Sequence, residues 1–130
     1  MALPHAASGD LLDIGPLGPK LAGTKSHTLV QSPSIEIFRM ALPAGKEVAP
    51  HRVAGAITVQ CLEGAIELAA HGRVIEMRAG HLVYLEPQAL HGLKALEDAS
   101  VLVTLVHAGE RAARSGPEAL APVGPARPRP

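Results

Sequence analysis

The chain has 130 residues, which suits one domain with an ordinary core. Its 12 Lys and Arg balance its 12 Asp and Glu, so nothing favours a polyanionic partner such as nucleic acid. Only 2% of residues are aromatic against 47% hydrophobic, which excludes an aromatic platform for stacking bases and requires an aliphatic core. With one cysteine, no visible signal peptide and no apolar run of membrane-spanning length, we expect a cytoplasmic protein without membrane partners.

Taken in chain order, the sequence predicts an irregular arm, a β-rich body and a tail. Residues 1–27 hold several prolines and glycines, which exclude a long regular element, yet their leucines predict packing on the barrel or on a neighbouring subunit. Short apolar or alternating segments then predict strands at 27–31, 35–41, 57–62, 65–70, 73–77, 82–85, 91–95 and 101–106. Many short strands separated by turns indicate a sandwich or barrel. Residues 108–130, rich in Ala, Pro and Arg, predict a flexible tail.

Two stretches, residues 43–68 and 79–96, repeat one arrangement of glycine, turn, histidine and apolar strand. We expect His51 and His91 each to open a strand after a proline-containing turn. Although they are distant in sequence, a small all-β fold can bring both inside.

These stretches resemble the two motifs of the cupin family over residues 28–107. The first motif is matched by Gly45, His51 and Gly64, but Val53 stands at its second histidine position and Ile57 at its glutamate position. The second motif is matched by Gly80 and His91, with Glu86 at its proline position and Gln88 at its glycine position. The resemblance implies an all-β fold, a jelly-roll barrel known as a double-stranded β-helix, with an N-terminal arm and a C-terminal tail.

The resemblance also implies which strand faces line the barrel. Side chains alternate across a strand, so Ile57, Val59 and Cys61 share one face, and His91 shares a face with Leu93. With these faces inward, the interior is an apolar pocket with two imidazoles at one end, as in many small-molecule sites. The expected pocket residues are Val53, Ile57, Val59, Cys61, Val83, Leu85 and Leu93.

His51 and His91 are also the candidate metal ligands. Two histidines and a carboxylate form a common iron site, and imidazole also suits Ni and Zn, so the possible cofactor is Fe, Mn, Ni or Zn. Ile57 stands where the expected carboxylate would be. The candidates for a third donor are therefore Glu63, His81, Glu86 and His107. The alternative is that both histidines are hydrogen-bonded structural residues.

Other reactive side chains have simpler interpretations. Cys61 is interpreted as a small buried hydrophobe rather than a nucleophile. Arg39 and Arg52 are placed to meet a ligand carboxylate at the mouth, although solvated or salt-bridged arginines are commoner.

Three functions stay open at this point. The first is binding of a small organic ligand in an apolar barrel without redox chemistry. The second is a metal-dependent oxygenase that uses His51 and His91, and the third is a structural barrel with a closed core. The sequence does not decide whether the protein is an enzyme. Strands with two apolar faces predict a homodimer formed through a sheet.

Overall fold

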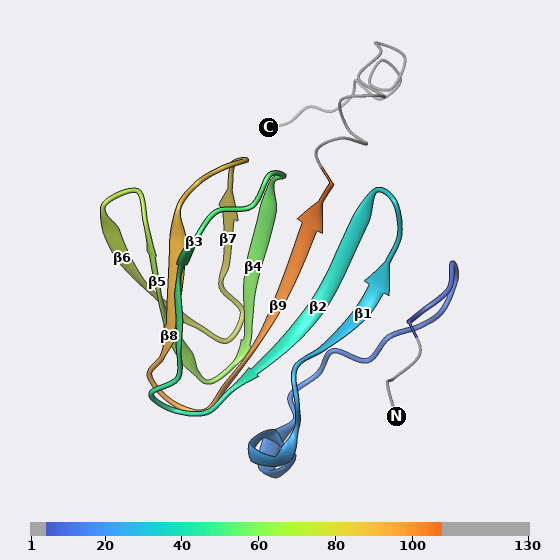
Figure 1. Ribbon diagram of the computed structural model, residues 1–130. Helices are drawn as coiled ribbons and strands as arrows, with labels where there is room; N and C mark the ends of the chain where they lie inside the picture. The colour runs from blue at the N-terminus through green and yellow to red at the C-terminus, as the bar shows by residue number, and fades with distance from the viewer. Residues whose placement is uncertain (1–4, 108–130) are drawn as a thin grey trace.

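The computed structural model describes residues 5–107, which form one short helix and nine strands (Figure 1). A 3₁₀ helix, η1, spans Gly18–Gly23. The strands are β1 (His27–Gln31), β2 (Ile35–Leu42), β3 (Glu47–His51), β4 (Ile57–Glu63), β5 (Ala65–Ala70), β6 (Arg73–Arg78), β7 (Leu82–Leu85), β8 (His91–Ala95) and β9 (Ala99–Val106). The expected all-β fold is confirmed, and the expected tail at 108–130 lies outside the described residues.

Two antiparallel sheets face each other and enclose the core (Figure 1). One sheet has the order β1-β2-β9-β4-β7 and the other β3-β8-β5-β6. The fully buried side chains between them are mainly aliphatic, as the scarcity of aromatic residues required. Alternation is visible along β4, where Ile57, Val59 and Cys61 are buried and the intervening side chains are half-buried.

The hairpin between β5 and β6 follows its local sequence. His71 and Gly72 join the strands and both have positive φ, 52° and 73°. Two successive residues with positive φ are typical of the tight turn that matches the twist of a hairpin. The turn predicted at these two residues is confirmed.

Strand β3 was missed in the sequence, and its position corrects one expectation. His91 does open β8, but His51 ends β3 instead of opening a strand. Pro50 argues against a strand because it has no N–H to donate. β3 lies at the edge of its sheet, where that donor is not needed, and its pairing with β8 is irregular between Val48 and His51.

The N-terminal arm packs on its own barrel through a buried polar cluster. Arg39, only 5% exposed, donates hydrogen bonds to Ser100 Oγ (2.7 Å) and to the carbonyl oxygen of Gly15 (2.6 Å). The Glu63 carboxylate accepts hydrogen bonds from the backbone N–H groups of residues 17–18 and lies 3.8 Å from the Arg39 guanidinium. The buried charges are therefore paired and hydrogen-bonded, as burial requires. No helix within residues 5–107 is long and apolar enough to cross a membrane.

Candidate functional site

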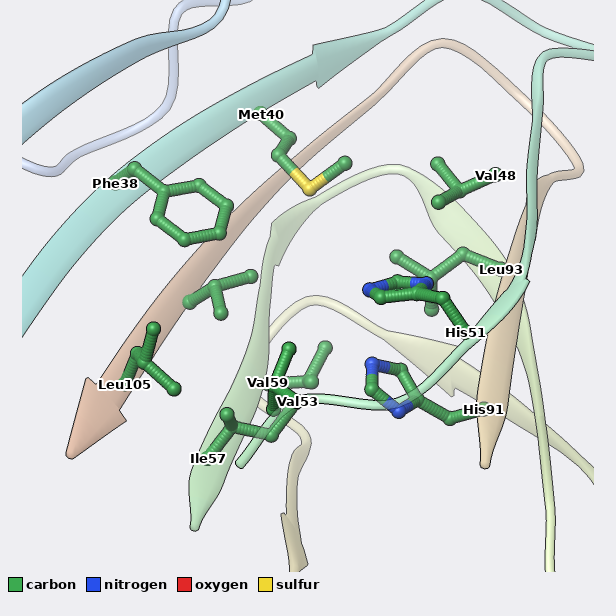
Figure 2. Close-up of a pocket in the computed structure, with 11 residues that line it drawn as sticks. Phe38, Met40, Val48, His51, Val53, Ile57, Val59, His91, Leu93 and Leu105 are labelled. Carbon is green, nitrogen blue, oxygen red and sulfur yellow. The ribbon is translucent and has the colours of Figure 1, made fainter. Parts of the chain in front are cut away.

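A cavity of about 150 Å³ lies between the sheets, at the end where β3 and β9 finish and β4 and β8 begin. This is the upper end of the barrel in Figure 1. Strands of both sheets contribute to its wall, and the side chains are shown in Figure 2. The residues that line it are Phe38, Met40, Val48, His51, Val53, Ile57, Val59, His91, Leu93, Val103 and Leu105.

Two imidazoles form one side of the cavity. His51 and His91 are paired residues of β3 and β8, and their ring centroids lie 4.5 Å apart at an interplanar angle of 51°. Gly92 allows β3 to approach this closely, because a Cβ at that position would meet the backbone oxygen of Val48 at 3.1 Å. His91 is buried, and His51 is exposed on its outer side.

In each ring, the contact of Nδ1 with the backbone carbonyl oxygen two residues earlier fixes the tautomer. His51 Nδ1 lies 3.1 Å from the carbonyl oxygen of Ala49, and His91 Nδ1 lies 2.9 Å from that of Ala89. A carbonyl oxygen only accepts, so in each neutral ring Nδ1 carries the proton. Nε2 of each ring is then left with a free lone pair. Figure 2 shows the second nitrogen of both rings directed into the cavity. The cavity therefore presents two hydrogen-bond acceptors.

The rest of the wall is apolar. Phe38 and Met40 project from β2, Leu105 from β9 and Ile57 from β4, facing the two rings (Figure 2). Val103 of β9 also lines the cavity. No lining residue is Asp, Glu, Lys or Arg. Among residues 5–107, the histidines are thus the only titratable groups that line the cavity.

Four of the seven residues expected in the pocket line this cavity, namely Val53, Ile57, Val59 and Leu93. Cys61 and Leu85 belong to the buried core instead, and Val83 is half-buried against that core. Cys61 shares a face with Ile57 but lies four residues further along β4, beyond the cavity. Its Sγ contacts the carbonyl oxygens of Glu63 (3.5 Å) and Gly64 (3.7 Å), and burial raises the pKa of its thiol.

Five lining residues were not predicted: Phe38, Met40, Val48, Val103 and Leu105. Alternation already groups Phe38 with Met40 and Val103 with Leu105. Both faces of β2 are largely apolar, however, so the pattern did not reveal which face is inward. Val48 was missed because β3 was missed.

None of the alternative third metal donors lines the cavity with the two histidines. Glu63 binds the N-terminal arm, and His81 Nδ1 accepts a hydrogen bond from the backbone N–H of Arg78 (2.9 Å). Glu86 lines an outer groove, and neither it nor His107 lines the cavity.

In the part of the chain that the structure describes, no group of three His, Cys, Asp or Glu is placed to hold a metal ion. Two imidazoles facing aliphatic side chains do not supply the three protein ligands of a typical resident catalytic metal. The donor set of this cavity does not fit one.

Arg39 and Arg52 are separated in the structure. Arg39 lies under the N-terminal arm, where it cannot meet a ligand of the cavity. Arg52 Nη1 donates to the carbonyl oxygen of Gln88 (3.0 Å) beside the outer groove.

Comparison with known proteins supports the architecture. Residues 38–107 match the family described as the cupin domain. A conserved protein of unknown function from Streptococcus pyogenes has 22% identity and a TM-score of 0.63, covering 82% of this chain and 94% of that chain. An RmlC-like cupin from Shewanella frigidimarina has 18% identity and a TM-score of 0.62, covering 80% and 91%.

One further similar structure carries an activity in its description. It is a salicylate 1,2-dioxygenase variant from Pseudoaminobacter salicylatoxidans in complex with gentisate, with 20% identity and a TM-score of 0.60. The similarity covers 69% of this chain but 26% of that one. At such identities the likeness concerns the fold alone. A search of curated proteins found no significant match.

Proposed function

The chain belongs to the cupin family, and on that premise we propose that its barrel binds a small, uncharged organic molecule that carries hydroxyl or N–H groups. The observation that supports this most directly is an otherwise apolar cavity in which two imidazoles offer free Nε2 acceptors.

The volume of the cavity sets the size of this ligand. A water molecule takes roughly 30 Å³ of liquid, whereas an apolar cavity of roughly 150 Å³ accepts a benzene-sized molecule. The cavity here, about 150 Å³, is therefore larger than a closed core requires and favours a ligand no bigger than a single ring. This weighs against the purely structural function.

The wall of the cavity sets the charge of the ligand. A buried anion needs a cationic or hydrogen-bond-donating partner, and none of the described residues that line the wall is a Lys or an Arg. Neutral imidazoles at Nε2 accept hydrogen bonds, so they pair with an O–H or N–H of the ligand. The aliphatic side chains then cover its apolar part.

Within residues 5–107, no third donor accompanies His51 and His91, which weighs against the metal-dependent oxygenase. The dioxygenase among the similar structures does not change this, since what it shares with this chain is the fold.

The test compares phenol with toluene, which has nearly the same size and shape but no donor. We expect phenol to bind about 2- to 10-fold more tightly, the worth of one net hydrogen bond. His51→Leu and His91→Leu are each expected to reduce this preference. Binding is measured from NMR shifts of the cavity methyl groups. Equal affinity for the two probes, or no binding of either, contradicts the proposal.

A matched pair of variants locates the ligand. Val103→Phe fills the cavity and is expected to abolish binding of phenol, whereas Val74→Phe on the exposed surface leaves it unchanged. Overpacking costs about 1–3 kcal/mol, so folding of Val103→Phe is first checked by circular dichroism. Phenol binding that survives in a folded Val103→Phe variant places the ligand elsewhere.

We also propose that the protein forms a homodimer through the outer face of its five-stranded sheet. Leu82 and Tyr84 of β7 are 60% and 63% exposed on this face, next to the uncharged side chains of Thr58 and Gln60 on β4. An exposed apolar patch without charges is typical of a protein interface. Light scattering is expected to give twice the chain mass, and Tyr84→Glu is expected to lower it. A monodisperse wild-type monomer contradicts this proposal.

A further inference from the structure

A second depression, separate from the cavity, lies on the rim of the barrel. We call it the rim groove. It is bounded by Arg52 after β3, by the β5–β6 hairpin with Arg73 and by the β7–β8 loop, residues 86–90. It has a volume of about 620 Å³, within the roughly 300–1,000 Å³ typical of small-molecule sites. His91 lies between the two, lining both the groove and the cavity.

The rim groove is basic. Arg52, Arg73 and His71 line it, whereas Glu86 is the one carboxylate among its described lining residues. Among the described residues no carboxylate lies within 4.0 Å of either guanidinium, while Arg78, outside the groove, pairs with two glutamates. Two arginines without a carboxylate partner on different walls of one depression are arranged for an oxyanion.

Arg52 is held in place by the opposite loop. Its Nη1 donates to the carbonyl oxygen of Gln88, and the backbone N–H of Gln88 donates to the carbonyl oxygen of Val53 (2.9 Å). These two hydrogen bonds hold Gln88 at a φ of 70°, which a residue other than glycine rarely adopts. Strained backbone of this kind persists where surrounding contacts fix it, often at binding sites. Within residues 5–107 the other N–H groups of Arg52 have no hydrogen-bond or carboxylate partner, so they can meet a ligand.

The floor and sides of the groove are small and aliphatic. Ala69, Ala70 and Ala89 leave it hollow, and Val74 and Leu90 add exposed apolar surface, 66% and 47%. No Phe, Tyr or Trp is among the described residues that line it. The groove therefore suits an aliphatic chain next to the arginines.

We propose that the rim groove is a binding site for an aliphatic carboxylate, whose carboxyl group pairs with Arg52 and Arg73. This proposal does not rest on the neutral-ligand cavity, because the two sites share no lining residue except His91 and the arginines line the groove alone. A planar carboxylate matches the fork of a guanidinium group, and its alkyl chain covers Val74 and Leu90.

The experiment titrates the protein with hexanoate and, separately, with hexanamide, its uncharged analogue, followed by backbone amide NMR shifts. We expect hexanoate to shift the amides of residues 52, 73, 86 and 88–90, and hexanamide to bind about 5-fold more weakly, the effect of losing a partly exposed ion pair. Added salt is expected to weaken the binding of hexanoate, because exposed charges are screened. Absence of binding at millimolar hexanoate, or equal binding of hexanamide, overturns the proposal.

Three variants separate the groove from general charge effects. Arg52→Gln and Arg73→Gln are each expected to weaken hexanoate binding about 5-fold, whereas Arg78→Gln removes the same charge outside the groove and leaves it unchanged. Because Arg52 also binds the loop, Arg73→Gln serves as the variant least able to disturb the fold. An equal loss in Arg78→Gln overturns the site.

The cavity variant Val103→Phe keeps the two proposals distinguishable. We expect it to bind hexanoate normally while it loses phenol. Loss of hexanoate in the folded Val103→Phe protein means that the carboxylate enters the cavity, and this overturns the groove site.

Discussion

Among the glycines that the structure describes, Gly64, between β4 and β5, is the one with the least room for a side chain. Its φ is 80°, and a Cβ there would collide with the backbone oxygen of Asp98 and approach Ala99 Cα to 2.8 Å. Both of these atoms belong to the backbone, which cannot move aside as a flexible side chain can. Gly72 has nearly the same φ, 73°, but a Cβ there meets nothing within 4 Å. The two glycines thus differ in the space available for a Cβ atom rather than in backbone conformation.

We therefore compare Gly64→Ala with Gly72→Ala. Each substitution places Ala in the left-handed region, at roughly 1–2 kcal/mol, and each restricts the unfolded chain by the same roughly 0.4–1 kcal/mol. These effects cancel in the comparison, so the difference measures the collision alone. We expect Gly72→Ala to lower the free energy of unfolding by about 1 kcal/mol and Gly64→Ala by about 3–5 kcal/mol, a large part of the roughly 5–15 kcal/mol of a typical domain.

The measurement is urea unfolding followed by circular dichroism, with equal slopes of free energy against urea as the control for two-state behaviour. If Gly64→Ala does not unfold the protein, its crystal structure is expected to show residues 64 and 98–99 displaced. Equal losses of stability in the two variants refute the reasoning, because they mean that the approach of the two backbones is not constrained.

Two further predictions concern the cavity and the core. Val53→His combined with Ile57→Glu adds an imidazole and a carboxylate beside His51 and His91. We therefore expect near-stoichiometric Ni or Zn in this variant by elemental analysis, against little in the wild type. A variant that remains folded but binds no metal contradicts the placement of these four side chains. Burial raises the pKa of Cys61 above its ordinary 9.0, so folding favours the protonated thiol. The stability that this protonation contributes is complete below pH 9.0 and is lost as pH rises above it. The free energy of unfolding is therefore expected to fall above pH 9 more steeply in the wild type than in Cys61→Ala. Parallel pH profiles of the two proteins contradict this.

The sequence predicted most of the strands because local rules govern them. Alternation along β4 and the His71-Gly72 turn depend on neighbouring residues only, and both are present in the structure. The cupin motifs gave the architecture, because their spacing carries information about the whole barrel. β3 was missed because a proline within a strand is acceptable only at a sheet edge, and edge position is a property of the assembled sheet.

The candidate site likewise has a part that the sequence predicted and a part that only the tertiary structure decided. Alternation, which is a property of one chain segment, together with the spacing of the cupin motifs was enough to place His51, His91, Ile57 and Val59 on the cavity. Which face of β2 is inward was decided by the opposing sheet, since both faces are apolar. The depth at which the cavity ends, short of Cys61, depends on how the side chains of both sheets fill the space between them. Composition and local pattern thus determined an aliphatic barrel with two histidines, and only tertiary packing decided the cavity's extent, the rim groove and the cluster that binds the arm, because each is formed by segments distant in sequence.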